Sequence, residues 1–375
     1  MTGSKLATIA FAAILGGLTL FNLFAPKRAF SESENRYLQQ LPELTAQSLF
    51  SGAFTKDFET YITDQFPLRD AWVGAKTLTG LSLGKLDNGR VYFGKQGQLF
   101  EVHERLDEQQ FTRNLQAVSA FLDKARAINP GLNASVMIVP TASQVRADLL
   151  PPYAPSFDQA PVLSRTQALL GDRAVCVDPT AALSALGDRA YYRTDHHWTA
   201  MGAYAAYTQW AGQVGLEPLP ESRFAVQRVS TAFYGTTYSK ANLFTIRPDE
   251  MYAYFDRDAQ PLSVAYEGTL TDSLYDDAFL QKKDKYSYFL GGNHPLTDIR
   301  TGVGNGKTLL VVKDSYAHCF LPFLTSHYQR ILAVDPRYYQ AGLQDLIRDE
   351  GITDVLVLYN VINFTTDKNV PNAAK

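Results

Sequence analysis

Cysteine is almost absent from this 375-residue chain, and neither sign of charge dominates it. The two cysteines, Cys176 and Cys319, stand in apolar segments without metal-site spacing, so we expect two buried thiols, with a disulfide as the alternative. The net charge is −3, and the lack of a basic patch argues against electrostatic capture of nucleic acid. HxH, HExxH and CxxC patterns, internal repeats and low-complexity tracts are also absent. The sequence therefore indicates neither a common zinc motif nor a repeat architecture.

Hydrophobic residues, in contrast, make up 46% of the chain and aromatic residues 12%, which is enough for a sizeable core. Residues 6–25 are uncharged and apolar, and a helix of this length spans the roughly 30 Å hydrocarbon layer of a membrane. We interpret residues 1–28 as an uncleaved single-pass anchor. A cleaved signal peptide is the alternative, but the run is long for one, and Pro26-Lys27-Arg28 follows it in place of a small-residue cleavage site. The flanking basic residues do not determine the orientation.

The remaining chain alternates between strand-like and helix-like segments. Residues 29–84 begin with a polar stalk and continue as a helical lead-in, and an amphipathic helix is expected from residue 107. Strands buried on both faces are predicted by five nearly continuous apolar runs, at 135–139, 174–177, 308–312, 330–334 and 354–358. Helix-compatible segments at 160–170, 199–214 and 340–350 separate most of these runs. The pattern predicts an α/β fold with a parallel sheet flanked by helices.

Residues 217–306 interrupt this alternation with many Tyr, Phe, Asp and Gly residues and little helical periodicity. We interpret them as an irregular insertion that folds over the site of a domain beginning at residue 85. In parallel sheets, sites form at the edge where the strands end. Polar residues follow the predicted strands at Thr141, Asp178, Ser315, Asp335 and Asn360.

The segment Asp195-His196-His197-Trp198 places a carboxylate, two imidazoles and an indole ahead of a predicted helix. Asp195 can accept a hydrogen bond from one ring nitrogen of His197 and leave the other nitrogen to take a proton from Ser315. Ser315 follows the apolar run 308–312 and precedes a helix predicted at 316–324, whose positive end would stabilise an oxyanion. The pattern predicts a nucleophile, a base and an orienting carboxylate.

Other interpretations of the same residues remain open at this point. Ser315 could be only a helix N-cap, His196 could brace its loop, and Trp198 could be a packing residue or a platform for a sugar. A zinc or manganese ion could instead be held by Asp195, His196 and His197 together with His294 or His318, although adjacent histidines in one loop rarely reach one ion without strain.

The Asp195-His196-His197-Trp198 motif resembles the signature of the DHHW family, bacterial exported proteins similar to the alginate O-acetylation proteins and, more distantly, to SGNH hydrolases. Several segments resemble landmarks of that family, in the same order: Ser33-Glu34-Asn35-Arg36-Tyr37-Leu38, Asp64-Gln65-Phe66-Pro67-Leu68-Arg69-Asp70, Tyr234-Gly235-Thr236, Gly291-Gly292-Asn293-His294-Pro295, Lys313-Asp314-Ser315-Tyr316 and Val334-Asp335-Pro336-Arg337-Tyr338. The alginate-type triad of an Asp-x-His pair and a later Ser corresponds to Asp195, His197 and Ser315. Because ordinary SGNH hydrolases carry the Ser first, the resemblance implies a permuted SGNH-like sheet within residues 85–375. His196 departs from the small hydroxyl residue more common at that position.

Motifs and resemblance together predict an extracytoplasmic O-acetyltransferase or acetylesterase acting on an exopolysaccharide or cell-wall glycan, without a cofactor. The backbone N–H of Ser315 or Tyr316 would hold the oxyanion. Further residues expected to bind the substrate or the oxyanion are Tyr316, Lys313, His196, Trp198, Tyr234, Asn293 and Arg337. The resemblance also implies a membrane-bound O-acyltransferase as partner. The alternatives are a non-catalytic glycan-binding or acyltransferase-docking protein and a metal-dependent hydrolase.

Overall fold

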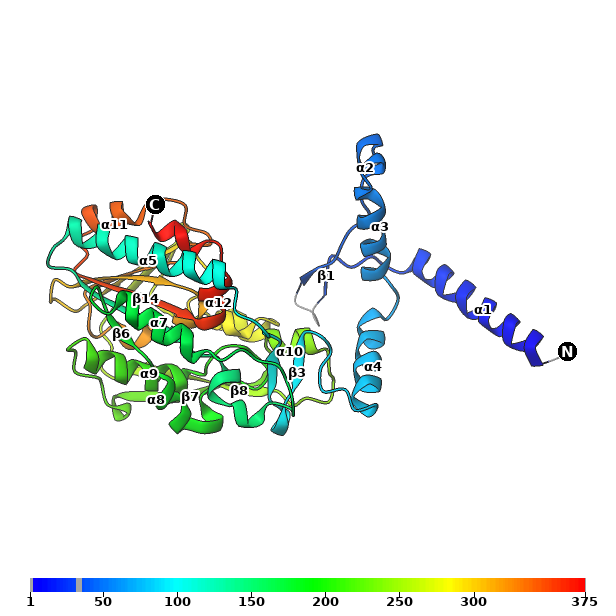
Figure 1. The fold of residues 1–375 in the computed structure, drawn as a ribbon, viewed down its shortest axis with the longest axis horizontal. Coiled ribbons are helices and arrows are strands. Elements are labelled where there is room, and N and C mark those ends of the chain that lie inside the picture. The colour runs from blue at the N-terminus through cyan, green and yellow to red at the C-terminus, as the bar shows by residue number, and fades with distance from the viewer. Residues whose placement is uncertain (1–2, 32–35, 375) are drawn as a thin grey trace. The chain divides into compact units, whose positions relative to one another are not determined.

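The structure is a computed structural model that describes residues 3–31 and 36–374 (Figure 1). The chain divides into two compact units. The first comprises Met1–Asn88 and Tyr238–Thr245, and the second comprises Gly89–Thr237 and Ile246–Lys375. The three residues of the predicted triad all belong to the second unit.

The first unit begins with α1 (Gly3–Phe24), the helix expected from the uncharged apolar run. Its stretch Gly3–Asn22 is long and apolar enough to cross a membrane, and none of it is buried inside the protein. This helix is compatible with the predicted anchor. The unit continues with short strands and helices: β1 (Phe30–Ser31), β2 (Arg36–Tyr37), α2 (Ala46–Phe50), α3 (Ala53–Asp64) and α4 (Arg69–Ser82).

Two of the landmark segments meet in the first unit. Asp64, buried at the end of α3, accepts hydrogen bonds from the Arg36 guanidinium at 2.9 and 2.5 Å and from the Gln39 N–H at 2.8 Å. The hydrogen bond from Arg36 lowers the pKa of Asp64, because it stabilises the ionised carboxylate. Residues 33–35 of the same landmark lie outside the described residues.

The second unit is built on an eight-stranded sheet with the strand order β10-β9-β11-β13-β12-β14-β5-β6. The strands β13 (Arg330–Val334), β12 (Thr308–Lys313), β14 (Asp354–Asn360), β5 (Asn133–Val139) and β6 (Val175–Val177) are parallel neighbours. They coincide with the apolar runs of the sequence, so the predicted parallel sheet is confirmed. All of them end at one edge, which therefore brings Ser315, Asp335 and Asn360 to the same side of the sheet.

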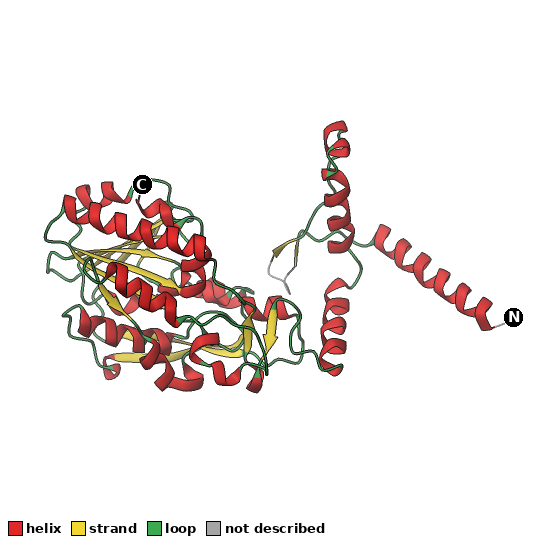
Figure 2. Cartoon of the chain, in the orientation of Figure 1, coloured by secondary structure: helices red, strands yellow, loops and turns green. Residues whose placement is uncertain are grey.

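Helices cover both faces of this sheet (Figure 2). Successive strand residues point to opposite faces, so Leu310 and Val312 pack with one group of helices and Leu309 and Val311 with the other. The first group contains α5 (Glu108–Ile128), α7 (Ala160–Leu170), α11 (Leu343–Asp349) and α12 (Val361–Thr366). The second contains α8 (Thr180–Leu186) and α9 (Ala200–Gln213). Burial on both faces explains why these strands are apolar throughout.

Residues 217–306 are more regular than the sequence suggested. They contain β7 (Phe224–Phe233) paired with β8 (Asp249–Asp256), and β9 (Leu262–Tyr266), β10 (Thr269–Thr271) and β11 (Leu296–Thr301), which extend the main sheet in antiparallel fashion. β7, β10 and β11 lack a continuous apolar run, and in β7 and β10 many residues are exposed. β8 does contain such a run, at residues 251–255. The apolar-run criterion finds only strands that are buried on both faces.

The helix predicted at 316–324 is not an α-helix. The chain forms two 3-10 turns instead, η7 (Ser315–Ala317) and η8 (Leu321–Leu324). Pro322 explains the interruption, because it has no N–H to continue a helical hydrogen-bond ladder.

The unit is completed by β3 (Val91–Phe93), β4 (Leu99–Glu101), α6 (Ala142–Val145), α10 (Thr236–Ala241, which continues into the first unit), η1 (Lys95–Gly97), η2 (Ala147–Leu149), η3 (Gly187–Arg189), η4 (Glu221–Arg223), η5 (Asp277–Gln281), η6 (Lys285–Tyr288) and η9 (Val370–Ala374).

Candidate active site

The loop that carries the DHHW motif is fixed at both ends. At its start, Thr194 donates hydrogen bonds from its N–H and its hydroxyl to Asp249 Oδ2, both at 2.7 Å. At its end, Thr199 caps α9 by accepting a hydrogen bond from the Gly202 N–H at 3.0 Å. An antiparallel bridge between Tyr191 and Trp198 closes the loop. The loop thus presents the side chains of its central residues in a defined direction.

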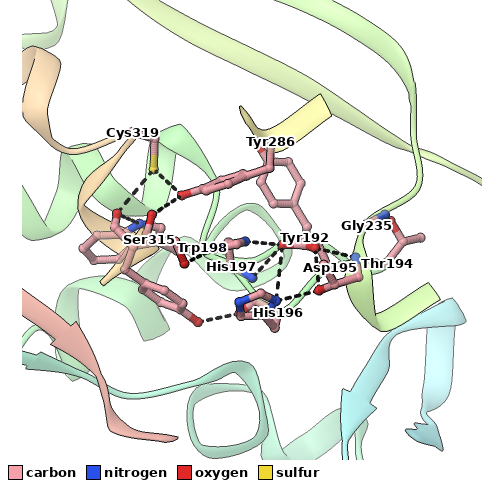
Figure 3. Close-up of polar contacts among 12 residues, drawn as sticks. Tyr192, Thr194, Asp195, His196, His197, Trp198, Gly235, Tyr286, Ser315 and Cys319 are labelled. Carbon is pink, nitrogen blue, oxygen red and sulfur yellow. Dashed lines mark hydrogen bonds and ion pairs between the residues drawn. The ribbon is translucent and has the colours of Figure 1, made fainter. Parts of the chain in front are cut away.

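Asp195, His197 and Ser315 form a continuous chain of hydrogen bonds (Figure 3). His197 Nδ1 lies 2.5 Å from Asp195 Oδ1, and the same oxygen accepts the His197 backbone N–H at 2.9 Å. His197 Nε2 lies 2.8 Å from Ser315 Oγ. The structure therefore brings together three residues from the loop and from the turn after β12. Asp195 and His197 are buried, whereas Ser315 is partly exposed.

The second oxygen of Asp195 is held by the start of α10. The Thr236 N–H donates to Asp195 Oδ2 at 2.7 Å, and the Thr236 hydroxyl lies 3.0 Å from the same atom. Gly235 makes this approach possible, because a Cβ at that position would lie 2.2 Å from the Asp195 side chain. Although burial raises the pKa of Asp195, the neighbouring imidazoles of His197 and His196 outweigh it and hold the pKa well below its usual range.

His197 is enclosed by aromatic side chains. The ring of Tyr286, from η6, stacks on the imidazole with the centroids 3.6 Å apart and the planes 8° from parallel. Burial, followed by the nearby His196, lowers the pKa of His197 to about 4, although Asp195 opposes the shift. His197 is therefore neutral at pH 7. Because Asp195 accepts the proton on Nδ1, Nε2 presents its lone pair to Ser315.

His196 supports the network from its other side. Its Nδ1 lies 2.7 Å from the Thr236 hydroxyl, which in turn contacts Asp195, and its backbone carbonyl accepts a hydrogen bond from the Tyr316 hydroxyl. Its side chain remains 31% exposed. These contacts match the bracing role considered for His196.

Trp198 and Tyr316 are both fully buried, so neither side chain reaches a substrate in this structure. The Trp198 indole N–H donates to the Tyr316 carbonyl at 2.9 Å, which ties the loop to the turn that carries Ser315. The Tyr316 N–H donates to Asp314 Oδ1 at 2.9 Å and is therefore not available to an oxyanion. The Ser315 N–H has no hydrogen-bond acceptor within residues 3–31 and 36–374. Of the two backbone donors predicted from the sequence, only that of Ser315 remains.

Asp314, rather than Ser315, is the cap of the turn. Its Oδ2 accepts hydrogen bonds from the Asn360 N–H at 3.0 Å, from the Asn360 side chain at 2.7 Å and from the Asn363 side chain at 2.9 Å. Asn360 lies at the end of β14, the strand next to β12. These bonds fix the turn to the sheet edge, so the position of the Ser315 hydroxyl depends on two neighbouring strands.

The remaining predicted residues lie around the site without bonding to the triad. Lys313 is fully buried, with its Nζ 2.9 Å from His318 Nε2 and 4.0 Å from Asp335 Oδ2. Arg337 makes a bidentate pair with Asp335 at 2.9 and 2.6 Å and also donates to Asn293 Oδ1 at 3.2 Å. Among the described residues, these side chains form a separate polar cluster.

Tyr234 lies just before Gly235, and its ring faces Lys283 Nζ at 5.7 Å from the ring centroid. Cys176 and Cys319 are both free thiols, so the disulfide alternative is not realised. Cys319 is buried as expected, but Cys176 is only partly buried, because it lies on the edge strand β6.

A metal ion at the DHHW motif would compete with the hydrogen bonds of the triad. The possible ligand atoms of Asp195, His196 and His197 lie within 4.8 Å of one another. This group includes neither His294 nor His318 within the described chain. His294 Nδ1 lies 2.8 Å from Glu267 Oε2, and His318 faces Lys313, so each already has a partner. An ion at the motif would have to displace hydrogen bonds that hold Asp195 and His197.

The chain resembles known proteins in both sequence and fold. The family model described as DHHW protein matches residues 176–334 of the chain. The match contains both the Asp195-His196-His197-Trp198 motif and Ser315, so the resemblance to the DHHW family that the sequence motifs indicate is confirmed. A curated relative is "Probable alginate O-acetylase AlgJ" of Pseudomonas syringae pv. tomato, 27% identical over 253 residues. The alignment covers 62% of this chain and 62% of that protein. The chain thus matches less than two thirds of the relative's length.

Solved structures show the same fold. A DHHW family protein from Eubacterium siraeum is 24% identical, superposes with a TM-score of 0.65, and the match covers 75% of this chain and 97% of the other. PatB1 of Bacillus cereus is 15% identical and has a TM-score of 0.60, with 72% of this chain and 96% of the other covered. These likenesses confirm the α/β architecture predicted from the sequence.

Thr236 and Tyr286 contact the triad but were not predicted from the sequence. Thr236 orients Asp195. It belongs to the Tyr234-Gly235-Thr236 landmark, but of that segment only Tyr234 was predicted from the sequence as a site residue. Tyr286 covers His197, but it comes from a stretch rich in tyrosine that carries no recognisable pattern. Its position depends on tertiary packing.

Proposed function

We propose that this protein is an extracytoplasmic O-acetyltransferase, or acetylesterase, that acts on an exopolysaccharide or cell-wall glycan through Ser315, His197 and Asp195. The observation that carries the proposal is the unbroken chain of contacts from Asp195 Oδ1 through His197 to Ser315 Oγ, at 2.5 and 2.8 Å. Similarity to a relative named as an alginate O-acetylase supports a polysaccharide as the acceptor. The partly exposed Ser315 gives a substrate access to an otherwise buried network.

The reaction proceeds in two transfers. Ser315 Oγ attacks the carbonyl carbon of the acetyl donor while His197 Nε2 takes the hydroxyl proton, which gives a tetrahedral oxyanion and an imidazolium. Ionised Asp195 stabilises that imidazolium through Nδ1. The imidazolium then returns the proton to the leaving group, the bond to the donor breaks, and an acetyl ester remains on Ser315.

The second transfer regenerates the enzyme. His197 removes the proton from a sugar hydroxyl, whose oxygen attacks the acetyl carbonyl on Ser315. The bond to Ser315 Oγ breaks, Ser315 recovers the proton from His197, and the acetylated sugar leaves. Water in place of the sugar gives acetate, which is the esterase reaction.

The N-terminal helix supports a location at a membrane, and the family resemblance supports the outer face of that membrane. An anchor in α1 would hold the second unit near the membrane, where a membrane-bound O-acyltransferase could supply acetyl groups. This partner is part of the proposal and follows from the family resemblance.

Turnover of an activated acetyl ester, such as p-nitrophenyl acetate, tests the proposal. We expect Ser315→Ala to lower kcat by about 10³-fold or more, since a triad without its nucleophile loses most of its activity. Ser164→Ala removes an exposed hydroxyl on α7 and should leave turnover unchanged. A chelator should also have no effect.

The alternatives give different results in the same assay. A metal-dependent hydrolase would lose its activity in the chelator and recover it with added zinc or manganese. Glycan binding that survives the loss of Ser315, with no ester turnover by the unsubstituted protein, would instead favour a binding or docking protein and contradict the proposal.

A further inference from the structure

His318 is a buried histidine that the reaction described above does not use. It follows Ser315 by three residues in the turn after β12, and only 2% of its surface is exposed. Its Nε2 lies 2.9 Å from Lys313 Nζ. Its Nδ1 is buried and has no hydrogen-bond partner in the part of the chain that the structure describes.

The contact with Lys313 determines which nitrogen of His318 carries the proton. Burial lowers the pKa of Lys313 to about 8, partly offset by Asp335, so the amine is mostly an ammonium at pH 7. An ammonium has only donors, and His318 Nε2 must therefore accept. Burial, together with the charge of Lys313, holds the pKa of His318 well below its usual range, so the ring is neutral. The single ring proton is then on Nδ1.

His318 belongs to the same turn as the reacting Ser315. Residues i and i+3 of a 3-10 turn lie on the same side, which places His318 on the side of Ser315. The His318 backbone N–H bonds to the Ser315 carbonyl at 3.2 Å. The ring of Tyr286 faces both imidazoles, with its centroid 3.6 Å from that of His197 and 6.2 Å from that of His318.

We propose that the Nδ1–H of His318 is the second donor of the oxyanion hole, beside the backbone N–H of Ser315, and that Lys313 is the positioning residue that keeps the proton on Nδ1. The inference rests on the proposed acetyl transfer. An acetyl group joined to Ser315 Oγ brings its carbonyl oxygen to this side of the turn from within the site. A donor that is unpaired before the reaction and paired in the tetrahedral intermediate stabilises the transition state selectively.

Two substitutions separate this role from a structural one. The amide nitrogen of asparagine can occupy the place of Nδ1, so His318→Asn keeps the donor and loses the acceptor for Lys313. The longer His318→Gln can place its carbonyl at the position of Nε2, so it keeps the acceptor for Lys313 and loses the donor. The two variants should therefore rank in opposite order in stability and in activity.

We expect His318→Gln to lower the rate of Ser315 acetylation by p-nitrophenyl acetate by about 10²-fold or more with little change in KM, the usual effect of losing one oxyanion donor. His318→Asn should stay within about tenfold of the unsubstituted protein, although it should melt at a lower temperature than His318→Gln. An acetylation rate that follows the melting temperature, or is unchanged in both variants, would overturn the inference.

A spectroscopic measurement keeps this test independent of the proposed function. The 15N chemical shifts of the imidazole, measured at pH 7 on the full chain, should show the proton of His318 on Nδ1, and Lys313→Met should weaken that preference. A proton on Nε2 in the unsubstituted protein would contradict the inference even if Ser315 is acetylated normally. If the unsubstituted protein shows no acetylation while the proton is on Nδ1, the acetyl-transfer proposal fails, and with it the use of this donor.

Discussion

Asp195 is the most constrained residue of the site, because both of its carboxylate oxygens accept hydrogen bonds. One oxygen faces His197 and the other faces Thr236. A carboxylate with this many donors remains ionised, and its orientation determines that of the imidazole. The other ring nitrogen of His197, Nε2, lies 2.8 Å from Ser315 Oγ. Asp195 thus determines the orientation of the His197 ring, and His197 determines which ring nitrogen faces Ser315.

The dependence of kcat/KM on pH should report the low pKa of His197. The working form is the neutral imidazole, since an imidazolium cannot take the proton of Ser315. With a pKa of about 4, activity should be constant between about pH 5 and 7 and fall about tenfold per unit as the pH drops below 4.

Circular dichroism at each pH would separate this loss from unfolding. An acid limb near pH 6.5 in a protein that stays folded would show that burial does not lower the pKa of His197, and would contradict this account of the site.

At the scale of elements, the site is the meeting point of three segments: the loop before α9, the turn after β12 and the start of α10. Gly235 lies where two of these segments touch. Gly235→Ala should displace Asp195, because the added Cβ would lie 2.2 Å from its side chain. We expect a loss of about 10²-fold or more in kcat for ester turnover, up to the roughly 10⁴-fold loss that follows replacement of the orienting carboxylate in another triad.

Gly212→Ala, on α9, is the matched control, because a Cβ there meets nothing within 4 Å. It should leave turnover unchanged. Equal turnover in both variants would show that the approach of α10 to Asp195 has no bearing on catalysis.

The sequence predicts some of these elements and not others. The central strands were predicted because burial on both faces makes them apolar throughout, and the edge that carries Ser315 followed from them. The α-helix expected after Ser315 was wrong, since Pro322 interrupts the helical hydrogen-bond ladder and two 3-10 turns form instead. Thr236 lies 41 residues after Asp195 in the sequence, and Tyr286 lies 89 residues after His197. A local sequence pattern does not predict contacts between residues so far apart.

At the scale of the whole molecule, the chain joins an apolar helix at its N-terminal end to a folded unit that carries the site. The full chain should sediment with membranes and resist alkaline carbonate extraction, because residues 6–25 present about 20 apolar residues to lipid. A chain that starts at residue 29 should be found in the soluble fraction.

N-terminal sequencing of the full-length product gives the control for this fractionation. A membrane-associated protein that begins before residue 6 supports the anchor. A soluble product whose first residue lies beyond residue 25 would show that the helix is a cleaved signal peptide.

The central claim is that Ser315 carries the acetyl group between donor and acceptor. It is tested most directly by peptide mass spectrometry of the protein, quenched in acid shortly after mixing with p-nitrophenyl acetate. The account predicts a mass increase of one acetyl group on the peptide that contains Ser315, its loss on addition of a glycan acceptor, and none in Ser315→Ala. An unmodified Ser315 in a protein that still turns over the ester, with the same turnover in Ser315→Ala, would contradict it.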